Sequence, residues 1–248
     1  MDELPESLLL EILSRLDNSA DIASCRVASK ALNTVFPDLR TINLYCSSRK
    51  SSISLKKVFV DLISKLRIVE SVCICLQDAV DEDFAKEWLP RVSQSLNSLS
   101  LSGSLYQGLR PSNVLTLVSV SCHNLAELNL GSAWLSVRNL NPMPMLTSAW
   151  LKLEACWNPE DWEISDGRKG LKTIRAYLML VDPSLTFSYV ACVLDQCVGL
   201  SVVSLLIHAN VVDTESKSFM SECMARWPQL KWRWGIWGEY MKDTWITD

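Results

Sequence analysis

The residue types that could carry covalent chemistry are few in this 248-residue chain, which contains two histidines and nine cysteines. Nucleophilic catalysis requires a serine or cysteine beside a histidine that an acid orients. Cys122 and His123 are adjacent, but neighbouring side chains on one helix project about 100° apart. His208, the other histidine, stands apart from any comparable partner. The sequence therefore predicts a protein that is not an enzyme.

Metal and cofactor sites are also poorly supported. Cys73 and Cys75 share one face if they lie on a strand, but the chain has no CxxC pair and too few histidines to complete a zinc site. The segment Gly167–Gly170 lacks the spacing of a phosphate-binding loop. We predict no metal and no cofactor. The odd number and irregular spacing of the cysteines indicate reduced thiols, as expected in the cytoplasm or nucleus.

The charge distribution narrows the class of partner. The formal net charge is -4 and no dense cluster of Lys and Arg occurs, whereas nucleic acids and anionic membranes demand clustered positive charge. The longest apolar runs fall short of the roughly 20 residues that cross a bilayer. We expect no nucleic acid and no membrane as partner, but another protein.

Three short helices are expected within the first forty residues. Pro5 suits the first position of a helix, because its φ is fixed and its missing N–H loses no hydrogen bond there. Asn18 and Ser19 are capping residues ahead of a second helix, and a third runs from Ser29 to Val35. The apolar residues of the first helix are Leu8, Leu9, Leu10, Ile12, Leu13 and Leu16. A unit this small needs a partner or a neighbouring domain, so part of that apolar surface is predicted to be an interface.

The same forty residues resemble the F-box motif, in order and without gaps. The matching residues are Leu4-Pro5-Glu6, Leu8-Leu9, Ile12-Leu13, Leu16, Asp21-Ile22, Cys25 and Ser29-Lys30. The resemblance implies binding to a Skp-type adaptor and, through it, to the cullin of an SCF-type ubiquitin ligase. The adaptor-binding residues that it implies are Leu4, Pro5, Leu8, Ile12 and Leu16. Ala28 and Leu32 are smaller than the valine and the aromatic residue that the family usually has there, which predicts weaker docking.

The rest of the chain carries a repeat of the form apolar-x-x-apolar-x-apolar. It starts at Leu39, Val69, Leu96, Leu125, Leu146, Leu171 and Leu200, with a degenerate unit at Trp227. The first seven starts are 21 to 30 residues apart, close to the spacing of leucine-rich repeats, about 20–29 residues. Segments whose apolar residues have helical spacing lie between the strands, most clearly from Leu55 to Leu66. Each unit is expected to be a strand and a helix, stacked into a solenoid with a parallel sheet on its concave side. An ordinary parallel α/β domain is the alternative.

An F-box followed by such repeats resembles the F-box/leucine-rich-repeat subfamily, especially its plant members. The resemblance implies an α/β protein with an F-box at residues 1–42 and a solenoid of seven or eight irregular repeats at residues 43–248. It implies a substrate-recognition subunit of the ligase, whose repeats bind an unidentified protein substrate while other subunits perform the transfer chemistry. The alternatives are a repeat scaffold without a ligase role and a receptor that needs a small molecule.

The strands also suggest where a substrate binds. Residues between the apolar positions of each strand point away from the helices, because side chains alternate along a strand. Early strands place Asn43, Cys73, Ser100 and Asn129 there, and later ones place Trp150, Lys152, Arg175 and Tyr177. Interface hot spots favour Trp, Tyr and Arg. We therefore predict that Trp150, Arg175 and Tyr177 bind a partner with an acidic segment.

The C-terminus is rich in tryptophan. The last 22 residues hold five of the ten tryptophans, interleaved with charged residues. A solenoid must cover the apolar end of its last repeat. We predict that this segment caps the repeats, with Trp234 and Trp237 as the main capping side chains.

Overall fold

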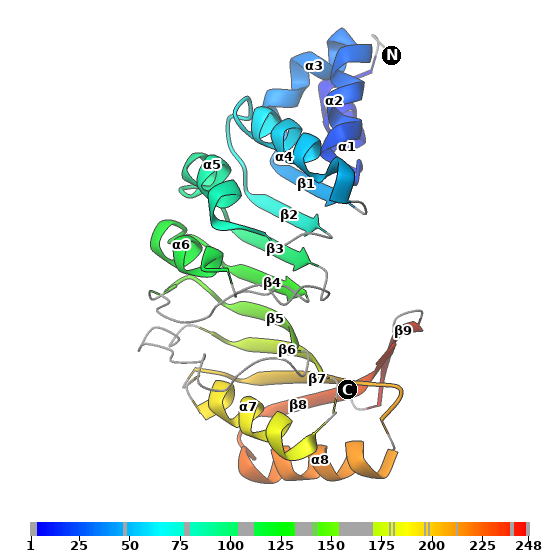
Figure 1. Ribbon diagram of the computed structural model, residues 1–248, viewed down its shortest axis with the longest axis vertical. Helices are drawn as coiled ribbons and strands as arrows, with labels where there is room; N and C mark the ends of the chain where they lie inside the picture. Colours follow the sequence, from blue (N-terminus) through cyan, green and yellow to red (C-terminus); the bar gives the residue numbers. More distant parts are fainter. Residues whose placement is uncertain are drawn as a thin grey trace. The chain divides into compact units, whose positions relative to one another are not determined.

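The computed structural model describes residues 4–46, 49–76, 80–103, 112–131, 141, 143–153, 171–178, 180, 182–195, 197, 199–211, 213–238 and 241–246. Its contacts divide the chain into two compact units, residues 1–125 with 133–136 and residues 126–132 with 137–248. Each unit combines a parallel sheet with helices (Figure 1), which confirms the mixed α/β class. The predicted domain boundary at residue 42 stays a prediction.

The first unit begins with the expected short helices. Its elements are α1 Glu6–Ser14, α2 Ser19–Ala28, α3 Lys30–Val35, η1 Phe36–Asp38, β1 Thr41–Cys46, α4 Arg49–Ile63, β2 Ser71–Leu76, α5 Glu82–Val92, β3 Ser98–Gly103 and α6 Val114–Ser121. The strands pair in parallel in the order β1, β2, β3, with Leu44, Ile74 and Leu101 aligned. In Figure 1, α4 and α5 run along one side of these strands. Apolar residues of each strand are buried toward that side, and the residues between them are partly exposed.

An aromatic cluster fills the space between α4 and α5. The ring centroids of Phe59 and Trp88 lie 6.1 Å apart, edge to face, and those of Phe59 and Phe84 lie 5.9 Å apart. Trp88 is completely buried. Aromatic pairs at such distances contribute about 0.5–1.5 kcal/mol beyond the apolar area that they bury. The cluster therefore fixes the two helices against each other.

The second unit contains the later strands. Its elements are β4 Glu127–Gly131, β5 Ser148–Leu153, β6 Thr173–Leu178, α7 Pro183–Asp195, β7 Val202–His208, α8 Asp213–Arg226, β8 Lys231–Gly238 and β9 Met241–Trp245. Strands β4 to β8 are parallel neighbours in chain order. The eight predicted strands are thus all present. Strand β9 was not predicted, and it pairs with β8 in the antiparallel direction.

Several strand starts are joined to the preceding one by the same backbone feature. The carbonyl of Arg40 accepts hydrogen bonds from the amides of Glu70 (2.8 Å) and Ser71 (3.1 Å). The carbonyl of Glu70 accepts in turn from Asn97 (2.8 Å) and Ser98 (3.0 Å). In the second unit the carbonyls of Ala126, Thr147 and Lys172 each accept two amides in the same way. This forked acceptor sets the register of successive strands through the backbone alone.

None of the helices in the described residues combines the length and apolarity that a bilayer span requires.

Candidate functional site

The first candidate surface lies on α1. Helix formation starts at Pro5, whose carbonyl accepts the amides of Leu8 (3.0 Å) and Leu9 (3.1 Å). Pro5 has an extended backbone (φ -56°, ψ 145°) and occupies the N-cap, whereas the sequence placed it at the first helical position. Helix α1 therefore begins at Glu6. The fixed φ of Pro5 still suits the turn into the helix. Pro5 itself is exposed.

The apolar residues of α1 form two faces. Leu9 and Leu13 are 3% and 0% exposed and pack into the first unit. Leu4, Leu8 and Ile12 are 40%, 45% and 41% exposed. Leu8 and Ile12 are four positions apart within α1, which aligns them on one side of the helix, and Leu4 lies just before the N-cap Pro5. Leu16 continues this spacing just beyond the helix and is half-buried. The predicted adaptor-binding residues thus include an exposed apolar row of Leu4, Leu8 and Ile12, which we call the α1 row.

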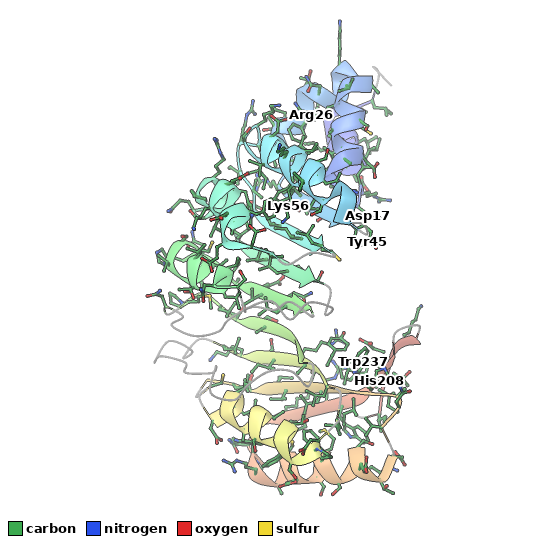
Figure 2. All side chains as sticks on the ribbon, in the orientation of Figure 1. Asp17, Arg26, Tyr45, Lys56, His208 and Trp237 are labelled. Atoms are coloured by element: carbon green, nitrogen blue, oxygen red, sulfur yellow. The ribbon has the colours of Figure 1, made fainter. Side chains whose placement is uncertain are left out.

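Helix α1 packs against α3, and α2 and α3 are themselves fixed by caps and one cation–π contact. The Asn18 side chain accepts the amide of Ala20 (3.3 Å), and the Ser29 hydroxyl accepts the amide of Leu32 (3.3 Å). The Arg26 guanidinium lies 4.0 Å from the ring centroid of Phe36, which is fully buried. Figure 2 labels Arg26 within this group of helices. The α1 row is therefore presented by a packed support.

The two positions that depart from the F-box motif lie in different environments. Leu32 is 3% exposed, so its smaller size changes packing among the helices rather than the exposed surface. Ala28 is exposed at the end of α2. Only the departure at Ala28 therefore alters an accessible surface.

The second candidate surface is centred on β6 in the other unit. Arg175 and Tyr177, both predicted to bind substrate, lie on the same face of the strand. The Tyr177 hydroxyl donates to Asp243 Oδ2 at 2.8 Å, and Arg175 Nη2 lies 3.4 Å from the same oxygen. Burial and the hydrogen bond to Asp243 raise the pKa of Tyr177, and the nearby Arg175 charge opposes the rise. The phenol is therefore protonated at neutral pH and can donate to a carboxylate.

Trp245 of β9 completes this cluster. The guanidinium carbons of Arg175 and Arg233 lie 4.8 Å and 4.7 Å from the centroid of its ring. Both arginines and Tyr177 thus contact side chains of β9, with Asp243 as the anion and Trp245 as the aromatic surface. We call these five residues the β9 cluster. Sequence reasoning placed Arg175 and Tyr177 here but missed Asp243 and Trp245, because β9 lacks the apolar repeat.

Trp237 closes the other side of Tyr177. Its ring centroid lies 5.8 Å from that of Tyr177 and 4.6 Å from that of His208, edge to face in both cases. Figure 2 labels His208 and Trp237, which lie together at the carboxyl ends of β7 and β8. The Trp237 indole donates to the carbonyl of Leu178 at 3.2 Å. Trp237 therefore supports the β9 cluster, while Trp234 is aligned with Leu205 in the β7–β8 ladder.

The remaining predicted residues are placed by register. Trp150 is aligned with Arg175, and Lys152 with Tyr177, in the β5–β6 ladder. The side chains of Trp150 and Lys152 lie outside the described residues. Asn129 is aligned with Trp150 one strand earlier. Asn43, Cys73 and Ser100 are aligned with one another in the first unit.

The residues considered for catalysis do not form a reactive pair. Cys122 is buried directly after α6, whereas His123 is exposed, so the two do not share a helix as assumed. Burial raises the pKa of the Cys122 thiol to about 11, which keeps it in the unreactive thiol form at neutral pH. Among the described residues, no group of three or more His, Cys, Asp or Glu side chains is placed to hold a metal ion.

Comparison with known proteins gives one informative similarity. The chain matches no protein-family model. It is 36% identical over 174 aligned positions to an F-box/LRR-repeat protein of Arabidopsis thaliana, and the alignment covers 59% of this chain and 39% of that protein. The chain thus spans about two fifths of the length of that relative. This similarity supports a relationship of the chain to the F-box/LRR-repeat proteins.

Proposed function

We propose that this chain is the substrate-recognition subunit of an SCF-type ubiquitin ligase. In this proposal residues 1–42 are an F-box that binds a Skp-type adaptor through Leu4, Pro5, Leu8, Ile12 and Leu16. The remaining residues are a leucine-rich-repeat solenoid that binds a substrate protein. The observation that carries the proposal is the α1 row: Leu4, Leu8 and Ile12 are 40–45% exposed, whereas Leu9 and Leu13 of α1 are buried.

The physical argument for an interface concerns the cost of exposing this stripe. Burial of apolar surface contributes about 25 cal/mol per Å² removed from water. Three large apolar side chains left 40–45% exposed on α1 and just before it therefore favour association with another protein. The similarity to an F-box/LRR-repeat protein favours the adaptor of a ubiquitin ligase as that partner.

In this proposal the chain binds the substrate and other subunits transfer ubiquitin. The described residues offer no reactive Cys–His pair, and β6 presents partly exposed Arg175 and Tyr177 on one face, which suits protein binding. Ubiquitin transfer is therefore assigned to other subunits, with the cullin reached through the adaptor. The complex is expected to act in the cytoplasm or nucleus.

The first prediction concerns capture of a Skp-type adaptor by the purified full chain. The double variant Pro5→Ala with Ile12→Ala removes the fixed φ at the start of α1 and one side chain of the α1 row. Truncating an isoleucine that is buried in the complex costs about 2–5 kcal/mol, so capture is expected to fall at least about 30-fold. The measurement is adaptor affinity by calorimetry or surface plasmon resonance.

The matched control for this experiment is Ile68→Ala. Ile68 is 48% exposed, similar to Ile12, but lies in the connection before β2 rather than on α1. Its affinity for the adaptor should equal that of the wild-type chain. Wild-type affinity in the double variant, with an unchanged melting temperature, would sink the F-box assignment and leave a repeat scaffold as the better description.

A further inference from the structure

The β9 cluster has the composition expected of an occupied binding site. Arg175 and Tyr177 come from β6, and both contact Asp243, a residue 68 and 66 positions later in the chain. Arg233 from β8 adds a second guanidinium against the Trp245 ring. The chain's own strand thus supplies the carboxylate and the aromatic surface that these three residues are suited to bind.

The way β9 is attached makes it replaceable. It is five residues long and pairs with β8 in a ladder that contains an irregularity between Ile236 and Gly238. Lys242, Thr244 and Ile246 are exposed. Short strands at the edge of a sheet are the elements that an incoming extended peptide replaces by pairing with the same backbone groups.

Gly235 shows how closely this site fits an extended backbone. A Cβ atom at Gly235 would collide with the carbonyl oxygen of Thr244. The absence of a side chain there therefore lets the occupying strand approach β8 directly. A glycine at a point of close backbone approach is typical of sites that accept another strand or a ligand.

We propose that β9 is a built-in occupant of a binding site for an extended protein segment that carries Asp or Glu followed two positions later by an aromatic residue. The spacing of two follows from Asp243 and Trp245, because side chains two apart share one face of a strand. A substrate segment of this chemistry replaces β9 along β8 and takes over its contacts with Arg175, Tyr177 and Arg233. The proposal rests on the substrate-receptor part of the proposed function.

The contacts that β9 makes are ones that a second segment can also make. The Arg175 and Asp243 side chains are 23% and 28% exposed and 3.4 Å apart, so an incoming carboxylate replaces one partly buried ion pair with another of the same kind. Occupation by β9 lowers the apparent affinity for a segment in proportion to the fraction of time that the site is free. Removing the two binding side chains of β9 should therefore strengthen binding of an external segment.

The experiment uses the full chain and a fluorescent peptide with the sequence of residues 240–246, Tyr-Met-Lys-Asp-Thr-Trp-Ile. Its affinity is measured by fluorescence anisotropy for the wild-type chain and for Asp243→Ala combined with Trp245→Ala. The double variant is expected to bind at least about tenfold more tightly, as for a site that β9 occupies about 90% of the time or more. A peptide in which the Asp and Trp are replaced by Asn and Ala should bind neither protein.

A matched pair of arginine variants locates the site. Arg175→Ala in the double-variant background should abolish binding. Arg226→Ala is the control, because Arg226 also contacts a tryptophan ring (Trp227, 5.1 Å) and an aspartate (Asp195, 2.7 Å) but extends from α8. It should leave peptide affinity unchanged. Equal loss in both would overturn the proposed location.

Two further measurements cover other outcomes. If the double variant is misfolded by circular dichroism, deletion of residues 239–248 tests the same point, because it removes β9 and leaves Gly235 and the rest of β8 unchanged. The shortened chain should bind the peptide more tightly than the wild-type chain, and unchanged affinity in a folded variant would overturn the proposal. A wild-type dimer by light scattering that dissociates on removal of residues 239–248 would also overturn it, in favour of strand exchange between copies.

Failure of the peptide experiment can be distinguished from failure of the adaptor experiment. Loss of adaptor capture in the α1 variants leaves peptide binding intact, since α1 and the β9 cluster belong to different units. Failure of peptide binding with normal adaptor capture would reject this site alone.

Discussion

At the scale of single residues, α1 separates stability from binding. Leu13 is 0% exposed and Leu8 is 45% exposed, although both are leucines on the same helix. We predict that Leu13→Ala lowers the free energy of unfolding by about 2–5 kcal/mol, because it leaves a cavity in packed surroundings. Leu8→Ala should change it by less than about 0.5 kcal/mol. Urea denaturation of both variants provides the measurement, and equal destabilisation would show that the two faces of α1 are not distinct.

Residue identity predicted the β9 cluster only in part. Arg175 and Tyr177 were found because strand alternation and the hot-spot preference for Arg and Tyr both select them. Asp243 could not be found in this way, since 66 residues separate it from Tyr177 and neither charge nor hydrophobic pattern links the two. The expected carboxylate is present, but it belongs to the chain itself.

At the scale of elements, the start of α5 offers a test of a helix cap. The Asp81 carboxylate accepts the amide of Phe84 (2.7 Å) and contacts the Lys56 ammonium (2.9 Å). Asp81→Ala is expected to cost about 1 kcal/mol of stability, as for other N-cap replacements. Asp83→Ala is the control, because Asp83 is the second residue of the helix and its side chain is 95% exposed. Chemical denaturation at neutral pH should distinguish the two, and equal effects would reject the cap.

The same cap predicts a pH dependence. Burial raises the pKa of Asp81, but the Phe84 amide and the Lys56 charge outweigh it and hold the pKa below its ordinary value of 3.8. The folded state therefore binds fewer protons than the unfolded state near that pH, so the stabilisation is present above it and is lost as pH falls through the lowered pKa. The difference in unfolding free energy between the wild-type chain and Asp81→Ala should shrink below about pH 4.

Most elements were predictable because the apolar repeat marks where each strand begins. The template residues Leu39, Val69 and Leu96 each lie two residues before a strand, and the five later helices fall between strands as expected. Strand β9 has no such template and depends on β8 for its pairing, so local sequence gives no sign of it. Helix α1 was predicted to begin at Pro5 and begins at Glu6, a difference within the usual uncertainty of helix ends.

At the scale of the whole molecule, we predict that the C-terminal strands protect the last repeat. Strand β8 is aligned with β7 over seven residues, from Val202 with Lys231 to His208 with Trp237. Deleting residues 228–248 should expose the edge of β7 and cause aggregation or a lower melting temperature. Deleting only residues 239–248 removes β9 and keeps β8, so the shorter truncation should stay monomeric. Light scattering and thermal melting test both, and an equally stable chain without residues 228–248 would reject the capping role.

The forked carbonyl acceptors also govern the order of assembly during synthesis. They join backbone positions 21 to 30 residues apart, such as Ala126 with Thr147 and Arg40 with Glu70. Loop-closure entropy differs by only about 0.3 kcal/mol between those lengths, so each repeat closes onto its predecessor at a similar rate. As the chain leaves the ribosome, every new strand within a unit finds its acceptor carbonyl already in place. Within each unit, folding can therefore follow translation, one repeat at a time.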